Sequence, residues 1–204
     1  MNNLLAQYQG DILQLFKEHY KKLLTKSVEM KFEDVLHETF SELNIGKDKN
    51  SSAPFLSDWF SLVHEQSYVE TFLDRPLTEL IFHSASYVQV NTLDERIIFE
   101  NELLSEEDFQ LSLEVLALKN QVSWNFKDPF ASFSIKIKGT SFRATLIHNS
   151  TSSNLKSKMF LRSISLERPA LELFRLDKDV YELLESMIKE KRNILISGGT
   201  GSGK

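Results

Sequence analysis

The C-terminal end of the sequence carries the residues whose types and spacing best fit a chemical role. Four of the seven glycines in this 204-residue chain fall within its last seven positions. Together with one lysine they match the pattern G-x-x-x-x-G-K of a phosphate-binding P-loop. The matching run is Gly198-Gly199-Thr200-Gly201-Ser202-Gly203-Lys204. Glycines suit such a loop because its backbone N–H groups must point inward at phosphates, and side chains would block that approach. All seven residues are therefore candidates for binding ATP. Lys204, which would reach the β- and γ-phosphates, is the candidate catalytic residue.

The P-loop pattern normally continues with a Ser or Thr whose hydroxyl holds Mg²⁺. The sequence stops at Lys204. We therefore expect residues 1–204 to be the N-terminal portion of a longer protein, in which residue 205 would hold Mg²⁺. No Walker-B acid and no later strand of an ATPase sheet is found here, so this chain alone is expected not to hydrolyse ATP. A flexible Gly/Ser-rich tail is the alternative interpretation of the glycines.

Two predicted elements lead into this loop and would position it. A helix begins near Asp177, and basic residues follow at its C-terminal end, where the helix dipole favours cations. Its apolar stripe is formed by Val180, Leu183, Leu184, Met187 and Ile188. The run Asn193–Ser197 is short, apolar and β-branched in part, which predicts a buried parallel strand. A strand followed directly by the glycines is the order that P-loop proteins need, and it disfavours the flexible-tail alternative.

Charge is unevenly distributed upstream of the loop. Residues 94–114 contain eight acids and one base, for a net charge of −7. Residues 127–168 contain eight bases and two acids, for a net charge of +6. The basic stretch includes strand-like runs, and these lie at 131–138, 141–148 and 158–164. The sequence therefore predicts a basic β-structure about 60 residues before the glycine-rich loop.

A β-hairpin within this basic stretch would bring like charges together. With Gly139-Thr140 as a two-residue type II′ turn, Lys136 would lie directly opposite Arg143. The other face would be apolar and formed by Phe133, Ile135, Ile137, Phe142, Ala144 and Leu146. Like charges so paired are destabilising, and an anion bound over them would relieve the repulsion. A solvated face screened by salt, which costs little, is the alternative. Arg162, on the next strand, could join either face.

The rest of the sequence predicts a mixture of helices and strands. Helical periodicity covers residues 3 to about 44 and resumes after a polar linker near 46–53. Short β-type runs follow at 80–82, 87–90 and 97–99. Ser105 begins a capping box in which Asp108 replaces the usual Glu or Gln, and a helix is expected over 106–119.

Composition excludes several classes of protein. The chain is 41% hydrophobic and 26% charged, which indicates a globular domain with a core. It has no cysteine, so disulfides and thiolate metal sites are excluded in this stretch. The five histidines are scattered without ligand-like spacing, so no metal site is expected among these residues. No secretory signal or membrane span is predicted, and the net charge of −5 disfavours general nucleic-acid binding.

The segment from Asn193 to Lys204 closely resembles the Walker-A region of the type II/type IV secretion ATPase superfamily. Its doubled glycine, Gly198-Gly199, is most similar to the branch that contains type IV secretion traffic ATPases and Tad/Flp pilus assembly ATPases. Upstream segments resemble the opening strands and the two arginine-bearing strands of the family's N-terminal domain. These segments are Thr78–Phe82, Tyr87–Val90, Phe142–Ala144 and Phe160–Ile164. The resemblance covers about residues 75–204.

Helical periodicity in residues 1–70 and the resemblance of residues 75–204 together predict an α/β (α+β) fold in three parts. Residues 1–70 would form an N-terminal helical extension, and 75–168 a PAS-like α/β domain. Residues 169–204 would be the first helix and strand of a RecA-like P-loop ATPase domain. Arg143 and Arg162 would reach the nucleotide and sense its γ-phosphate through charge-assisted bidentate contacts. Two features depart from the family's pattern, because two extra residues separate Gly139 from its arginine and no Pro-Pro follows that strand.

The resemblance also implies what the whole protein does. It implies ATP and Mg²⁺ as cofactors and a homo-oligomer, in the form of a hexameric ring. It places this ring at the cytoplasmic face of the inner membrane, with the platform proteins of a pilus or secretion machine as partners and no nucleic acid. We therefore expect a motor ATPase that powers pilus assembly or protein secretion. Two alternatives stay open: a non-catalytic nucleotide-sensing or scaffold domain, and an unrelated P-loop NTPase such as a DNA translocase or kinase.

Overall fold

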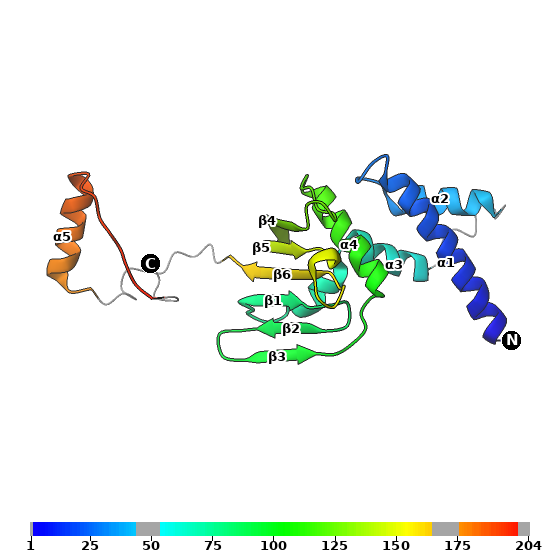
Figure 1. Cartoon of the computed structure of the whole chain (residues 1–204), viewed down its shortest axis with the longest axis horizontal. Coiled ribbons are helices and arrows are strands. Elements are labelled where there is room, and N and C mark those ends of the chain that lie inside the picture. Colours follow the sequence, from blue (N-terminus) through cyan, green and yellow to red (C-terminus); the bar gives the residue numbers. More distant parts are fainter. Residues whose placement is uncertain (1, 44–53, 165–175, 200–204) are drawn as a thin grey trace. The chain divides into compact units, whose positions relative to one another are not determined.

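The computed structural model describes residues 2–43, 54–164 and 176–199 (Figure 1). The chain divides into two compact units, Met1–Ile164 and Ser165–Lys204. The helices of the first unit are α1 (Asn2–Leu24), α2 (Phe32–Glu42), α3 (Pro54–His64) and α4 (Glu106–Lys119), with short 3₁₀ turns η2 (Ser67–Phe72) and η3 (Asn149–Thr151). Its strands are β1 (Glu79–Phe82), β2 (Val88–Asn91), β3 (Arg96–Phe99), β4 (Phe130–Ile137), β5 (Thr140–Ile147) and β6 (Lys158–Ser163). The second unit contains α5 (Lys178–Lys189).

All six strands form one antiparallel sheet in the order β3-β2-β1-β6-β5-β4. Because side chains alternate along each strand, one face carries the apolar residues that the sequence pattern predicts. This core face includes Leu80, Val90, Phe142, Ala144, Leu146 and Leu161, all buried. The opposite, outer face carries most of the polar and basic side chains. The mixed helix and antiparallel-sheet architecture confirms the predicted α+β class.

The β4–β5 hairpin differs from the predicted one in its turn. The turn residues are Lys138 and Gly139, with φ angles of 46° and 86°. Positive φ at both central positions is the geometry of a type I′ turn, which matches the twist of the flanking strands. Phe142 therefore faces Ile135, two residues from the predicted partner Ile137. Because the displacement is an even number of residues, every side chain stays on its predicted face.

Helices cover one side of the sheet (Figure 1). Leu113, Val115 and most other apolar residues of α4 are buried. They belong to one hydrophobic core that also contains side chains of α1, α2, α3 and the sheet. The helices of residues 2–64 therefore share their core with the sheet in the first unit. The linker predicted near 46–53 lies outside the described residues.

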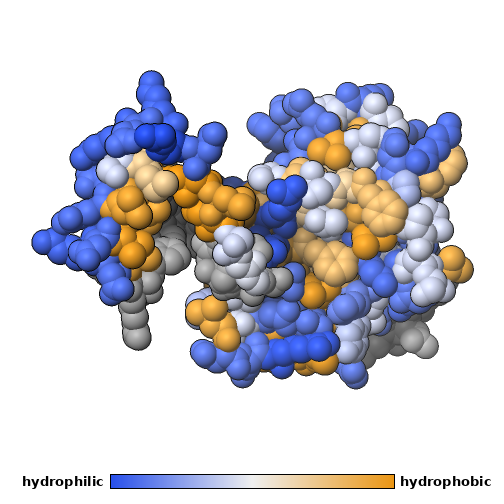
Figure 2. Space-filling model, turned by 60° about the vertical axis from the view of Figure 1, so that its left-hand side comes forward, coloured by the Kyte–Doolittle hydropathy of each residue, from blue (hydrophilic) through white to orange (hydrophobic). Residues whose placement is uncertain are grey.

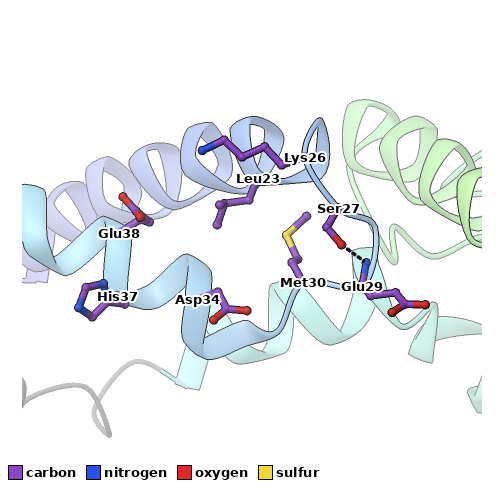
Figure 3. A pocket seen from close by; sticks show the side chains of 8 residues that line it. All are labelled: Leu23, Lys26, Ser27, Glu29, Met30, Asp34, His37 and Glu38. Carbon is purple, nitrogen blue, oxygen red and sulfur yellow. Dashed lines mark hydrogen bonds between the residues drawn. The ribbon is translucent and has the colours of Figure 1, made fainter.

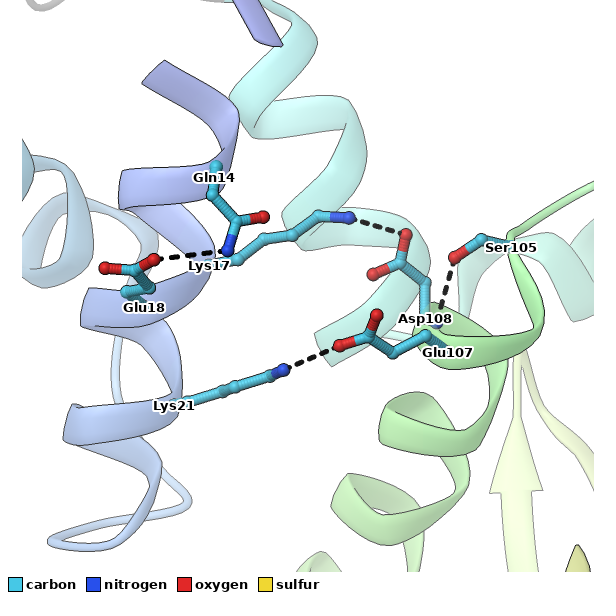
Figure 4. A network of polar contacts seen from close by, with 7 residues as sticks. All are labelled: Gln14, Lys17, Glu18, Lys21, Ser105, Glu107 and Asp108. Atoms are coloured by element: carbon cyan, nitrogen blue, oxygen red, sulfur yellow. Dashed lines mark hydrogen bonds and ion pairs between the residues drawn. The ribbon is translucent and has the colours of Figure 1, made fainter. Parts of the chain in front are cut away.

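The first turn of α4 makes both a local capping hydrogen bond and ion pairs with another helix. The Ser105 Oγ accepts a hydrogen bond from the Asp108 backbone N–H at 3.1 Å, as a capping box predicts. The reciprocal half of the box is absent, because the Asp108 carboxylate accepts from the Lys17 Nζ at 2.8 Å (Figure 4). A second lysine of α1, Lys21, pairs with Glu107 at 2.8 Å. The acidic first turn of α4 thus ties α1 to the rest of the unit.

The second unit has an amphipathic helix that leads into an extended segment. Hydrophobic atoms gather on one side of this body (Figure 2), and Leu183 and Ile188 of α5 are exposed. Asn193–Ser197 is not a strand, which corrects the prediction. A strand requires a hydrogen-bonded neighbour, and no described residue pairs with this run. Within the described ranges, no helix is long and apolar enough to cross a membrane.

Candidate functional site

The two arginines singled out by the sequence lie side by side on the outer face of the sheet. Arg143 on β5 is directly opposite Arg162 on β6. They belong to a polar row that crosses all six strands, formed by Arg96, Asn91, Glu79, Arg162, Arg143 and Ser134. Cβ atoms of directly opposite residues lie only about 5 Å apart. Two guanidinium groups therefore project from adjacent positions of two strands.

Neither arginine is neutralised within the part of the chain that the structure describes. Both are exposed, and within the described ranges Arg143 donates from its Nε only to the Ser132 hydroxyl, at 3.3 Å. Glu79 faces Arg162 across the strands, but its carboxylate accepts from the Asn91 amide at 3.0 Å. Neither Arg143 nor Arg162 forms an ion pair with a described residue. The pair consequently retains its full positive charge.

Two lysines extend this charge along the same face. Strand alternation places Lys136 of β4 and Lys158 of β6 on the outer face with the arginines. We call Lys136, Arg143, Lys158 and Arg162 the basic sheet face. Paired guanidinium groups bind phosphate or carboxylate oxygens with bidentate geometry. The arrangement is therefore suited to hold an anion over the row.

The structure corrects one predicted pairing and resolves one open choice. Lys136 was expected opposite Arg143, but it faces Ser141, and Ser134 faces Arg143. The reason is the type I′ turn, which shifts the pairing by two residues. Arg162, which could have joined either face, joins the face of Arg143. Arg143 therefore does face a like charge, but that charge belongs to Arg162 on β6 and not to Lys136 on β4.

The first two glycines of the predicted P-loop lie in the second unit. Gly198 and Gly199 follow the extended run after α5, and a Cβ at Gly199 would meet no atom within 4 Å. Thr200, Gly201, Ser202, Gly203 and Lys204 lie outside the described residues. The structure thus brings Arg143 and Arg162 together in the first unit and describes the first two glycines of the loop in the second.

Comparisons with known proteins return no matching protein-family profile and no matching curated protein. The solved structures similar to the chain include three ATPases. The VirB11 ATPase of the Brucella suis type IV secretion system has a TM-score of 0.48 and 15% identity, over 63% of this chain and 44% of its own. The pilus retraction motor PilT with bound ADP has a TM-score of 0.42 and 16% identity, over 58% and 34%. The Legionella pneumophila ATPase DotB has a TM-score of 0.36 and 10% identity, over 58% and 32%.

These neighbours belong to the superfamily that the C-terminal motif resembles. The chain spans less than half the length of each.

A cleft between the C-terminal end of α1 and α2 was not predicted from the sequence (Figure 3). Its volume is about 400 Å³, and it is lined by Leu23, Lys26, Ser27, Glu29, Met30, Asp34, His37 and Glu38. Two of its polar groups serve local structure: the Asp34 carboxylate accepts from the Lys31 backbone N–H, and the Ser27 hydroxyl accepts from the Glu29 N–H. No group of three or more His, Asp or Glu residues in the described ranges forms a metal cluster. The basic sheet face therefore remains the stronger candidate for a functional site.

A buried polar contact joins α1 to α3 behind the sheet. The Tyr20 hydroxyl lies 3.0 Å from the His64 Nδ1, and the His64 ring stacks on Phe60 with centroids 4.6 Å apart. Burial lowers the pKa of His64 to about 4, and the positive charge of Lys119 adds to this effect. Burial also raises the pKa of Tyr20. Both groups are neutral near pH 7, so this contact stabilises the helices rather than exchanging protons.

Proposed function

We propose that this chain is part of an ATP-binding motor ATPase of the type II/type IV secretion superfamily. The observation that carries the proposal is the P-loop run from Gly198 to Lys204, placed directly after a helix and an apolar extended segment. A loop of this composition offers inward-facing N–H groups and one lysine to the phosphates of ATP. Gly199, with open space around its Cα, is compatible with the close approach of a phosphate.

The basic sheet face would supply the second half of the nucleotide site. Arg143 and Arg162 are adjacent, exposed and free of carboxylate partners in the described part of the chain. Their mutual repulsion falls when an anion lies between them. We propose that this anion is the γ-phosphate of ATP held by the P-loop. In this proposal Arg143 and Arg162 sense the γ-phosphate, and its loss on hydrolysis would release them and so couple chemistry to movement.

We further propose the setting that the family resemblance implies. The whole protein would use Mg-ATP, assemble as a hexameric ring and act at the cytoplasmic face of the inner membrane with platform proteins of a pilus or secretion machine. Residues Thr200, Ser202 and Lys204 would contact phosphate directly, with the glycines shaping the loop. No residue of this chain is proposed as a Mg²⁺ ligand.

The proposal is tested by equilibrium binding of a fluorescent ATP analogue to the whole motor ATPase that the proposal implies. Lys204→Ala should weaken binding of the analogue, because the lysine contacts the β- and γ-phosphates. Lys191→Ala is the matched control, since Lys191 lies after α5 but outside the motif. Equal affinity of Lys204→Ala and Lys191→Ala would contradict the proposal.

A further inference from the structure

The two edges of the sheet are protected to very different degrees. An exposed edge strand offers unpaired backbone groups to any other strand, and proteins blunt such edges with short strands and charged residues. At one edge, β3 has four residues, and acids flank it at Asp94, Glu95, Glu100 and Glu102. At the other edge, β4 has eight residues, and its only charged side chain is Lys136. The β4 edge therefore lacks the usual protection.

The pairing of β4 with β5 determines which backbone groups face outward. The His148 N–H donates to the Pro129 carbonyl at 2.8 Å, so this pair is hydrogen-bonded. Hydrogen-bonded and non-hydrogen-bonded pairs alternate along antiparallel strands. The odd-numbered residues of β4 are therefore bonded to β5, and the even-numbered residues direct their N–H and C=O groups to the open edge. These residues are Phe130, Ser132, Ser134 and Lys136, all exposed. In the described part of the chain β4 pairs with β5 alone.

The sequence of β4 is complementary to itself when two copies run antiparallel. A two-fold axis at Phe133 places Ser132 opposite Ser134 of the second copy and Phe130 opposite its Lys136. Phe130 is 63% exposed, and the described residues give it no ring contact. A lysine ammonium over its ring is a favourable cation–π arrangement. On the core face, half-buried Phe133 would meet its own counterpart. Each outward N–H and C=O would then find a partner.

We propose that the β4 edge is a self-association surface, at which a second copy of this chain pairs antiparallel about Phe133 to form one continuous twelve-stranded sheet. The contact is isologous, so it differs from the head-to-tail contacts that close a ring. It uses the edge of the sheet and, of the basic sheet face, engages only Lys136, so Arg143 and Arg162 stay open. Strand pairing covers a small area, which predicts a weak, concentration-dependent dimer.

Because the chain has no cysteine, a single introduced thiol reports the register directly. Non-hydrogen-bonded antiparallel partners have Cα atoms about 4.5 Å apart, which a disulfide can bridge. Phe133→Cys should therefore form a reducible covalent dimer under mild oxidation. Ser153→Cys, in an exposed loop, controls for random collision. Equal cross-linking of the two variants overturns the proposal, and preferential cross-linking of Ser134→Cys overturns the register.

Charge variants test the same contact without oxidation. In the proposed register Ser132→Lys/Ser134→Glu creates two complementary pairs across the axis, whereas Ser132→Lys/Ser134→Lys creates two like-charge pairs. Sedimentation equilibrium should show the dimer strengthened by the first pair of changes and weakened about tenfold by the second. Circular dichroism checks that both variants fold. Identical association of the two variants, or a strictly monomeric unmodified chain, overturns the proposal.

The dimer proposal can be contradicted without contradicting the proposed function. Neither measurement involves a nucleotide, and Arg143→Ala and Lys204→Ala should associate like the unmodified chain. Loss of association in those two variants would contradict a contact confined to the β4 edge.

Discussion

Arg143 of β5 and Arg162 of β6 face each other directly across two hydrogen-bonded strands, and neither pairs with a carboxylate in the described part of the chain. Such a contact between like charges is unfavourable for folding. It is explained if the two guanidinium groups share an anion in the working protein. Under the proposed function, the arrangement exchanges some stability for an anion-binding site.

Removing one arginine should stabilise the free chain. We expect Arg143→Ala to raise the free energy of unfolding by a few tenths to about 1 kcal/mol at low ionic strength, because it relieves the repulsion of Arg162. Urea unfolding measures this. Arg143→Lys keeps the charge and should show little gain. The gain should shrink at about 1 M salt, where the Debye length is about 3 Å. A destabilised Arg143→Ala at both salt concentrations would show that the arginine contributes favourable contacts instead.

The two ion pairs between α1 and α4 should differ in their contribution to stability. Lys17 pairs with Asp108, whose side chain is only 11% exposed, whereas Lys21 pairs with Glu107, which is 77% exposed. Removing Lys17 leaves a buried carboxylate without its cation, which should cost roughly 2–3 kcal/mol in Lys17→Met. Lys21→Met should cost less than about 0.5 kcal/mol. Equal urea midpoints for the two variants would contradict this difference in burial.

Stability should fall in mildly acidic solution because of His64. Its pKa is about 4 in the folded chain, below its ordinary value of 6.5. The unfolded chain therefore binds a proton first as pH decreases, and stability is lost between about pH 6.5 and pH 4. The loss from this group is at most about 3 kcal/mol. His64→Gln can still accept from the Tyr20 hydroxyl but does not titrate. Its unfolding free energy should vary less over this range, and an unchanged pH dependence would exclude His64 as the cause.

The type I′ turn makes opposite predictions at its two positions. Gly139 has φ +86°, so Gly139→Ala should destabilise the chain by about 1–2 kcal/mol although no atom crowds the site. Lys138 has φ +46°, a conformation that asparagine tolerates better, so Lys138→Asn should be neutral or stabilising by up to about 1 kcal/mol despite losing the contact with Glu70. Thermal unfolding of both variants checks the sign of each change. Destabilisation by Lys138→Asn comparable to that of Gly139→Ala would contradict the turn type.

The sequence predicts the elements better than their pairing. Alternation and helical periodicity locate α4 and all six strands to within about two residues, because burial of one face imposes those periods. The hairpin register was wrong because Gly139 is compatible with two turns, and Lys138 at positive φ is an uncommon choice. Neither turn changes the faces, so the apolar face was predicted correctly. The Arg143–Arg162 contact depends on the β5–β6 pairing, which no local pattern encodes.

The C-terminal segment contains one prediction that was wrong and one motif that can be recognised from the sequence alone. Apolar, β-branched composition predicts a strand at Asn193–Ser197. Such composition shows only that these residues suit a sheet, and a strand forms only where a second strand pairs with them. The P-loop motif is in contrast recognisable from spacing alone, since its glycines and lysine act through the backbone and one charge. A motif can be recognised from residues that are neighbours in the sequence, whereas the strand that pairs with a given segment cannot.

The most direct test of the proposed nucleotide site is steady-state ATP turnover by the whole motor ATPase that the proposed function implies, comparing Arg143→Ala and Arg162→Ala with Lys136→Ala. Lys136 lies on the same basic face but is not opposite either arginine. We predict that each arginine variant lowers kcat by roughly 10²-fold, the size expected for losing one charged contact to a developing anion, while Lys136→Ala remains close to the unmodified protein. Unchanged turnover in both arginine variants would contradict the proposal that these arginines act on the phosphate held by Lys204.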